Sequence, residues 1–157
     1  MTVIAYRDGV LAADRFAVAG GVIWCHKTKI VRRAGDGALI GTAGSGPIGE
    51  RYKAWFLAGG DALRRPSLSQ MLDGEAHSAG ALVVRADGTV EEHCDLAVEI
   101  REGAFHAIGC GAVFALAAME MGASAARAVE VACRFDVHCG GGVDTLRLEE
   151  GRRIAAE

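Results

Sequence analysis

Apolar and polar positions fall into short runs separated by turn residues, a pattern typical of β-hairpins. Residues 3–6 and 10–13 flank Arg7-Asp8-Gly9, and Asp-Gly between apolar runs is a strong hairpin signal. Three more pairs follow: 29–31 with 38–42 across Asp36-Gly37, 81–85 with 89–93 across Asp87-Gly88, and 96–100 with 104–108 across Glu102-Gly103. With a last strand at 143–148, the pattern predicts antiparallel sheet of at least eight strands.

Helical spacing predicts two pairs of helices between these strands. The first helix begins near Pro47 and carries an apolar stripe: Ile48, Tyr52, Trp55 and Phe56. A short second helix is predicted at 67–72. A third runs over 113–121 and stops at Gly122, and a fourth is capped by Ser124. The apolar face of the fourth consists of Ala125, Ala128, Val129, Ala132 and Cys133.

The order of these elements favours an α+β fold. Strands, a helix pair, strands, a second helix pair and a final strand are most simply arranged as two stacked antiparallel sheets covered by helices on both outer sides. We therefore expect a four-layer αββα sandwich. No linker or low-complexity tract interrupts the chain, so residues 1–157 are expected to form a single domain.

Composition narrows the classes of partner and compartment. Seventeen basic and 20 acidic side chains give a net charge of −3, which argues against nucleic acid as the main partner. The sequence has neither an apolar run long enough to span a membrane nor a signal-peptide pattern, so we expect no membrane association and a cytoplasmic protein. Five cysteines, an odd number, fit reduced thiols better than a disulfide framework.

The candidate chemistry begins at Thr2. Removal of Met1 would leave a threonine that carries both a hydroxyl and a free α-amine. An α-amine titrates at about 7.7 to 8.0, so it can accept the hydroxyl proton near neutral pH. Asp14 at a strand end, Lys29 at a strand start, and the glycine-rich loop 41–46, which could provide an oxyanion hole, are the other candidate groups.

In this combination the sequence resembles the proteasome β-subunit and HslV peptidase family of N-terminal-nucleophile hydrolases. The matching motifs are Thr2-Val3-Ile4-Ala5, Ala12-Ala13-Asp14, Thr28-Lys29-Ile30, Ile40-Gly41-Thr42-Ala43-Gly44, Ala107-Ile108-Gly109-Cys110-Gly111, and Asp136 with Gly140-Gly141-Gly142-Val143-Asp144. They follow the family's order over nearly the whole chain, and 29–44 fits the HslV pattern without a gap.

The resemblance implies a role for each matching residue. Thr2 would be the nucleophile and its α-amine the base, while Lys29 would lower the pKa of that amine. Asp14 would hold Lys29, the N–H of Gly41 would face the oxyanion, and Asp136 would be a supporting acid. The activity implied is that of a threonine endopeptidase acting on unfolded proteins or peptides inside a homo-oligomeric ring, with no cofactor and no metal.

Two site positions depart from the family pattern. Cys110 stands where relatives have the serine of Gly-Ser-Gly, and Cys139 stands where proteasome subunits carry a further serine. A thiol is a weaker hydrogen-bond partner than a hydroxyl, so the network that orients the amine is expected to be weaker. The region 59–78 is shorter than in HslV, which leaves the docking of an ATP-dependent unfoldase open.

Three alternatives remain at this stage. One is a proteasome-like assembly subunit that does not cleave peptides. The loop 109–115 also has the glycine spacing of a dinucleotide-binding turn, although a second helix follows where a strand would be needed. Lastly, Cys25-His26, His93-Cys94 and His138-Cys139 contain metal-ligand types, but no Cys-x-x-Cys occurs, which favours ordinary thiols and imidazoles.

Overall fold

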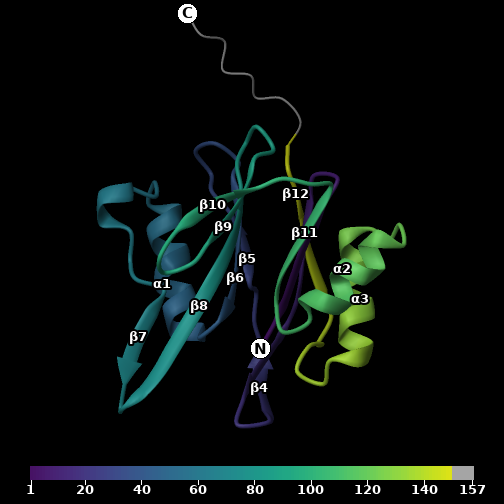
Figure 1. Cartoon of the computed structure of the whole chain (residues 1–157), viewed down its shortest axis with the longest axis horizontal. Helices are drawn as coiled ribbons and strands as arrows, with labels where there is room; N and C mark the ends of the chain where they lie inside the picture. The colour runs from purple at the N-terminus through teal and green to yellow at the C-terminus, as the bar shows by residue number, and fades with distance from the viewer. Residues whose placement is uncertain (150–157) are drawn as a thin grey trace, which may run out of the picture.

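The computed structural model describes residues 1–149, an α+β fold of antiparallel sheets and three α-helices (Figure 1). The strands are β1 (Val3–Arg7), β2 (Val10–Asp14), β3 (Phe16–Ala19), β4 (Val22–His26), β5 (Ile30–Arg32), β6 (Leu39–Gly44), β7 (Ser69–Leu72), β8 (Glu75–Val84), β9 (Val90–His93), β10 (Val98–Arg101), β11 (Phe105–Gly109) and β12 (Val143–Arg147). The helices are α1 (Gly46–Leu57), α2 (Ala112–Glu120) and α3 (Ala125–Phe135).

The first sheet has the strand order β11-β1-β2-β12. The predicted hairpin of β1 and β2 is confirmed, with Ile4 opposite Ala13 and Arg7 opposite Val10. Asp8 and Gly9 both adopt positive φ values, 49° and 75°, as a tight turn with a right-handed strand twist requires. This hairpin fixes the start of the chain in the middle of the sheet.

The second sheet has the order β10-β9-β8-β6-β5, and β7 pairs with the outer part of β8. The predicted hairpins β5–β6 and β8–β9 are confirmed. The hairpin predicted across Glu102-Gly103 is wrong, because β10 pairs with β9 and β11 pairs with β1. Pairing with β1 places Ile108 opposite Ile4 in the core, a burial that an isolated hairpin with the exposed β10 would not provide.

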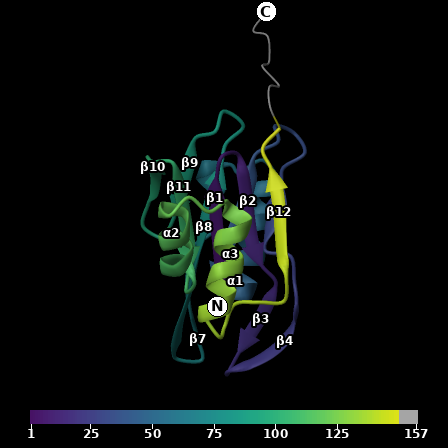
Figure 2. The ribbon, with the colours of Figure 1, turned by 90° about the vertical axis from the view of Figure 1, so that its right-hand side faces the viewer.

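Three apolar clusters hold these elements together. Ile4 and Leu11 of the first sheet meet Leu39 and Leu82 of the second. Alternate residues of β1, such as Val3, point the other way and pack against α2 and α3. The opposite face of the second sheet packs against Tyr52 and Phe56 of α1. Figures 1 and 2 show α1 on one outer side and α2 with α3 on the other.

The helix predicted at 67–72 is wrong. Residues 69–72 form strand β7, whose side chains are exposed and which hydrogen-bonds to β8. Within residues 1–149, the outer side of the second sheet therefore carries one α-helix and the short 3₁₀ turn Ala62–Arg64 instead of a helix pair. The α+β class with antiparallel sheets and helices on both outer sides (Figure 1) is confirmed, whereas the helix pair expected on each side is found on one side only within residues 1–149.

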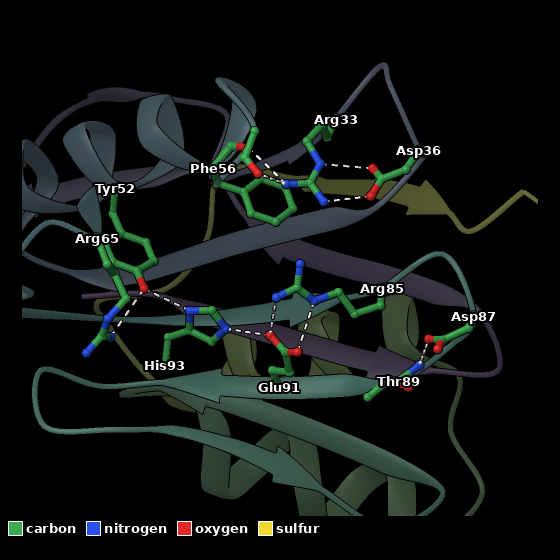
Figure 3. Close-up of polar contacts among 11 residues, drawn as sticks. Arg33, Asp36, Tyr52, Phe56, Arg65, Arg85, Asp87, Thr89, Glu91 and His93 are labelled. Carbon is green, nitrogen blue, oxygen red and sulfur yellow. Dashed lines mark hydrogen bonds and ion pairs between the residues drawn. The ribbon is translucent and has the colours of Figure 1, made fainter. Parts of the chain in front are cut away.

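A polar network, buried at Tyr52 and His93 and partly exposed at Arg85, lies between α1 and the second sheet (Figure 3). Tyr52 Oη and His93 Nδ1 are 2.8 Å apart, and His93 Nε2 lies 2.8 Å from a carboxylate oxygen of Glu91. Arg85 completes it with an ion pair of 2.7 Å to Glu91. A neutral imidazole satisfies both contacts, accepting from Tyr52 and donating to Glu91. Burial, the largest influence, lowers the pKa of His93.

Within residues 1–149, no helix has both the length and the apolar character of a membrane span.

Candidate active site

Strand pairing and close backbone contact place Thr2 at the start of β1. Thr2 is buried, with 4% of its surface exposed, and its carbonyl accepts a hydrogen bond of 3.3 Å from the N–H of Gly111. Gly109 passes so close that a Cβ atom there would lie 2.1 Å from the Thr2 carbonyl oxygen. Gly109 also has a φ of 96°, a conformation that side chains disfavour. The glycines of the 109–111 segment thus allow the chain to pass against Thr2.

Asp14 and Lys29 form a buried ion pair beside this strand. Lys29 Nζ lies 2.7 Å from Asp14 Oδ1, and the two side chains are 4% and 0% exposed. Asp14 also accepts hydrogen bonds of 3.0 Å from the N–H groups of Val3 and Gly140. Because three donors converge on it, the carboxylate is held in one position and holds Lys29 in turn.

The ammonium group of Lys29 lies close to the peptide bond between Met1 and Thr2. Lys29 Nζ lies 3.4 Å from the carbonyl oxygen of Met1, and the Thr2 hydroxyl donates to the same oxygen at 2.6 Å. The hydroxyl, the ammonium group and the Met1–Thr2 peptide are therefore neighbours. In this form the Thr2 nitrogen is an amide, and it becomes a base only when Met1 is absent.

Cys110 contacts Thr2, and Asp136 and Cys139 lie beside Cys110. The N–H of Thr2 donates to Cys110 Sγ at 3.2 Å, and Cys110 Sγ lies 3.7 Å from Cys139 Sγ. Burial, followed by the influence of Asp136, raises the pKa of Cys110, and burial likewise raises that of Cys139. Burial also acts to raise the pKa of Asp136, but hydrogen bonds from Cys110 and His138 outweigh it and lower that pKa.

A pocket of about 270 Å³ opens beside Thr2 and Lys29. Its walls come from β3, from the segment 42–47 that joins β6 to α1, and from Trp24 of β4. Met1 lies in it as well. The hairpin β3–β4 was missed from the sequence, although its Gly20-Gly21 turn, with φ values of 58° and 74°, is a hairpin signal.

Gly41 lies inside β6, paired with Ile30 of β5 and Leu82 of β8. A Cβ atom there would lie 2.7 Å from Ile4, so this position requires glycine for packing. Gly41 is outside the pocket lining, whereas Gly44 and Gly46 belong to it. Its part in an oxyanion hole stays a prediction.

The structure brings together Thr2, Asp14, Lys29, Cys110, Asp136 and Cys139. Lys29 contacts Asp14, which binds the N–H of Val3 next to Thr2. Cys110 contacts both Thr2 and Cys139, and Asp136 lies beside the two thiols. The structure excludes the dinucleotide-binding alternative over residues 1–149, because β11 is antiparallel to β1 and α2 leads into α3. His93 is engaged by Tyr52 and Glu91, away from Cys94. The motif resemblance named Cys110, Asp136 and Cys139 as site residues, but not that their ligand-type atoms all lie within 4.8 Å of one another.

The site therefore combines a buried Lys29–Asp14 pair with buried Thr2 directly before β1, on two antiparallel sheets with helices on both outer sides. A scan against protein-family models gives no match, and neither does a search of curated protein sequences. Likeness to known proteins is therefore visible in the fold rather than in overall sequence.

Solved structures share this fold over nearly the whole chain. Eukaryotic HslV from Trypanosoma brucei matches with a TM-score of 0.63 and 22% identity, over 94% of this chain and 98% of that one. Thiobacillus denitrificans BPH matches with a TM-score of 0.61 and 18% identity, over 96% and 99%. The same protein in complex with epoxomicin gives 0.62 and 21%, over 94% and 98%. The HslV-type resemblance read from the motifs is thus supported at the level of the fold.

Proposed function

We propose that the chain is an N-terminal threonine peptidase in which Thr2, once Met1 is removed, cleaves peptide bonds. The observation that carries this proposal is the ammonium group of Lys29, fixed by buried Asp14 and adjacent to Thr2 at a pocket. A lone surface lysine would have no such restraint. The HslV-type fold and the binding of epoxomicin by Thiobacillus denitrificans BPH add support.

The proposed reaction uses one residue as nucleophile and base. The α-amine of Thr2 takes the hydroxyl proton while Oγ attacks the substrate carbonyl carbon. Lys29 keeps the amine unprotonated by electrostatic repulsion. The tetrahedral intermediate then expels the substrate amine, which receives the proton, and water hydrolyses the resulting ester of Thr2.

The oxyanion of that intermediate needs backbone N–H donors near Thr2. We assign the role to Gly41 in β6, as the motif resemblance implies, and note that Gly44 and Gly46 lie at the pocket itself. The N-terminal turn of α1, which begins at Gly46, has N–H groups without intrahelical acceptors.

The pocket is the proposed site for the substrate side chain next to the scissile bond. Phe16, Val18 and Trp24 contribute apolar wall, and the nearby Lys27 is paired with Glu50 at 2.6 Å. We therefore expect a preference for uncharged, apolar side chains. Assembly into a homo-oligomeric ring, location in the cytoplasm and partnership with an ATP-dependent unfoldase extend the same proposal by likeness to the HslV-type fold.

Peptide hydrolysis by a matched set of variants tests the proposal. A panel of fluorogenic peptides with apolar, acidic and basic residues before the reporter is compared for wild type, Thr2→Ala, Thr2→Ser and the distant control Thr89→Ala. We expect Thr2→Ala to lower kcat/KM by roughly 10³-fold or more, Thr2→Ser to retain part of the activity, and Thr89→Ala to match wild type. Hydrolysis that survives Thr2→Ala would instead direct attention to Cys110 and Cys139. A wild type that assembles but cleaves nothing would favour an inactive assembly subunit.

A further inference from the structure

Two thiols and a carboxylate converge beside Thr2 from two separate parts of the chain. Cys110 follows β11, whereas Asp136 and Cys139 lie between α3 and β12. The two sulfur atoms are 3.7 Å apart, and both lie within 4.8 Å of an Asp136 oxygen. Cys139 is buried, Asp136 is partly buried, and Cys110 is open to the site. In the proposed peptidase reaction neither thiol is the nucleophile or the base.

The sulfur separation fits a tetrahedral metal site better than a disulfide. Two thiolates bound to Zn²⁺ at about 2.3 Å lie about 3.8 Å apart across a tetrahedral angle. The observed separation is 3.7 Å. A disulfide would require the sulfur atoms to approach to about 2.05 Å, a far larger movement. For the carboxylate, a zinc–oxygen distance of about 2.1 Å corresponds to a sulfur–oxygen separation of about 3.6 Å, within reach of a small rotation of Asp136.

The surroundings orient these groups. The backbone N–H of His138 donates to Asp136 Oδ1 at 2.9 Å, and the His138 ring nitrogen Nδ1 lies 3.1 Å from the same oxygen. Hydrogen bonds of this kind orient metal-binding carboxylates.

A fourth donor lies next to the thiols. The nitrogen of Thr2 is 3.2 Å from Cys110 Sγ. While Met1 is present this nitrogen is an amide, a poor ligand, but a free α-amine at the same place would be a good nitrogen donor. This fourth contact rests on the proposed function, because it needs the N-terminal Thr2, whereas the three other ligands do not.

We propose that Cys110, Cys139 and Asp136 form a binding site for a thiophilic divalent cation such as Zn²⁺, and that the free amine of Thr2 completes its coordination. Binding replaces two S–H bonds by two metal–sulfur bonds and releases both protons to solvent. A metal on the amine occupies the lone pair that would accept the Thr2 hydroxyl proton. The site therefore binds a metal ion, and the bound metal inhibits the peptidase.

Cadmium titration tests the ligand set without reference to peptidase activity. Cd²⁺ is added to reduced protein, and the ultraviolet sulfur-to-cadmium charge-transfer band is followed for wild type, Cys110→Ser, Cys139→Ser, Asp136→Asn and the control Cys25→Ser/Cys94→Ser. Both control cysteines are exposed and lie outside the cluster. Circular dichroism checks that each variant is folded, and competition with a chromophoric chelator gives the affinity for Zn²⁺.

We expect one tightly bound Cd²⁺ per chain in wild type and in the control. Loss of either cluster thiol should weaken binding by more than the roughly 10- to 100-fold that removal of an outer hydrogen-bond partner costs. Asp136→Asn should weaken it less. Unchanged binding in Cys110→Ser or Cys139→Ser, or equal loss in the control, would overturn the site.

The Thr2→Ala variant separates this proposal from the peptidase proposal. It lacks the hydroxyl but keeps the three ligands, so it should still bind Cd²⁺. Each active form is then assayed against itself with and without Zn²⁺, and inhibition is expected for wild type and not for Cys110→Ser/Cys139→Ser. Metal binding without peptidase activity would refute only the proposed function, and activity without metal binding would refute only the metal site.

Discussion

Replacement of Lys29 by methionine should destabilise the protein strongly, because it breaks the buried ion pair on one side. Lys29 and Asp14 are 4% and 0% exposed and 2.7 Å apart. In Lys29→Met the side-chain length is nearly kept, but the Asp14 carboxylate loses its counter-ion. Removal of one partner from such a pair typically costs about 3–5 kcal/mol, since a charge is left buried without compensation.

Two structural features set where the effect falls within that range. Asp14 keeps the hydrogen bonds from Val3 and Gly140, each 3.0 Å long, and these reduce the cost of the orphaned charge. We therefore expect about 3 kcal/mol for Lys29→Met, near the lower end. Asp14→Asn should cost at least as much, because its amide disrupts one of the two backbone bonds and strands the ammonium group. Domains of this size have about 5–15 kcal/mol in total, so either loss is easily measured.

Urea unfolding at one fixed protein concentration measures these losses. Wild type, Lys29→Met, Asp14→Asn and the double variant form a cycle whose coupling energy isolates the pair. We expect the double variant to be more stable than the two single losses combined would give, with a coupling of at least about 1 kcal/mol. Single variants within the measurement error of wild type, or additive losses, would refute the reasoning that the pair is a buried unit.

Two further predictions concern backbone and protonation. Gly109→Ala should destabilise the protein more than the control Gly122→Ala. Both glycines have a φ near 95°, but only at 109 would the added Cβ lie 2.1 Å from the Thr2 carbonyl oxygen. Equal melting temperatures of the two variants would contradict this contact. The lowered pKa of His93 means that the unfolded chain takes up a proton more readily, so stability present above about pH 6.5 should fall as the pH drops below it. In thermal melts between pH 7 and 5, His93→Gln should reduce the fall in melting temperature with pH, and the exposed control His26→Gln should not. An unchanged pH dependence in His93→Gln would mean that another group is responsible.

Turn residues in the sequence predicted several hairpins correctly, but they did not identify the pairing partner of every strand. Asp8-Gly9 forces a turn through its own backbone conformation, so the pairing of β1 with β2 follows from neighbouring residues. Glu102-Gly103 resembles Asp8-Gly9 in sequence, yet β11 pairs with β1 and not with β10, because Ile108 is buried in that position. Strand β7 shows the same limit, since its pairing with β8 depends on how far β8 extends beyond the core. Long-range burial decides such cases.

The candidate site was only partly visible in the sequence. The site residues were named because their motifs resemble a known family, and the contacts that join Thr2, Asp14 and Lys29 depend on segments far apart in the chain. The grouping of Cys110 with Asp136 and Cys139 has no short spacing that would reveal it. It arises because the loop after α3 meets the loop after β11, where Cys139 Sγ lies 3.7 Å from Cys110 Sγ. The hydrogen bond from the Gly140 N–H to Asp14 holds the loop after α3 at the end of β2.

The intact mass of the protein, before and after exposure to a peptide epoxyketone, addresses the nucleophile itself. This reagent forms its stable adduct with the amine and hydroxyl of one N-terminal residue, so it reports on Thr2 alone. Protein expressed from Met1 is compared with protein released by a protease that cuts directly before Thr2, and Thr2→Ala is the control. We predict one adduct per chain whenever Thr2 is N-terminal, and none in Thr2→Ala. A folded chain with a free Thr2 that forms no adduct would contradict the proposed peptidase.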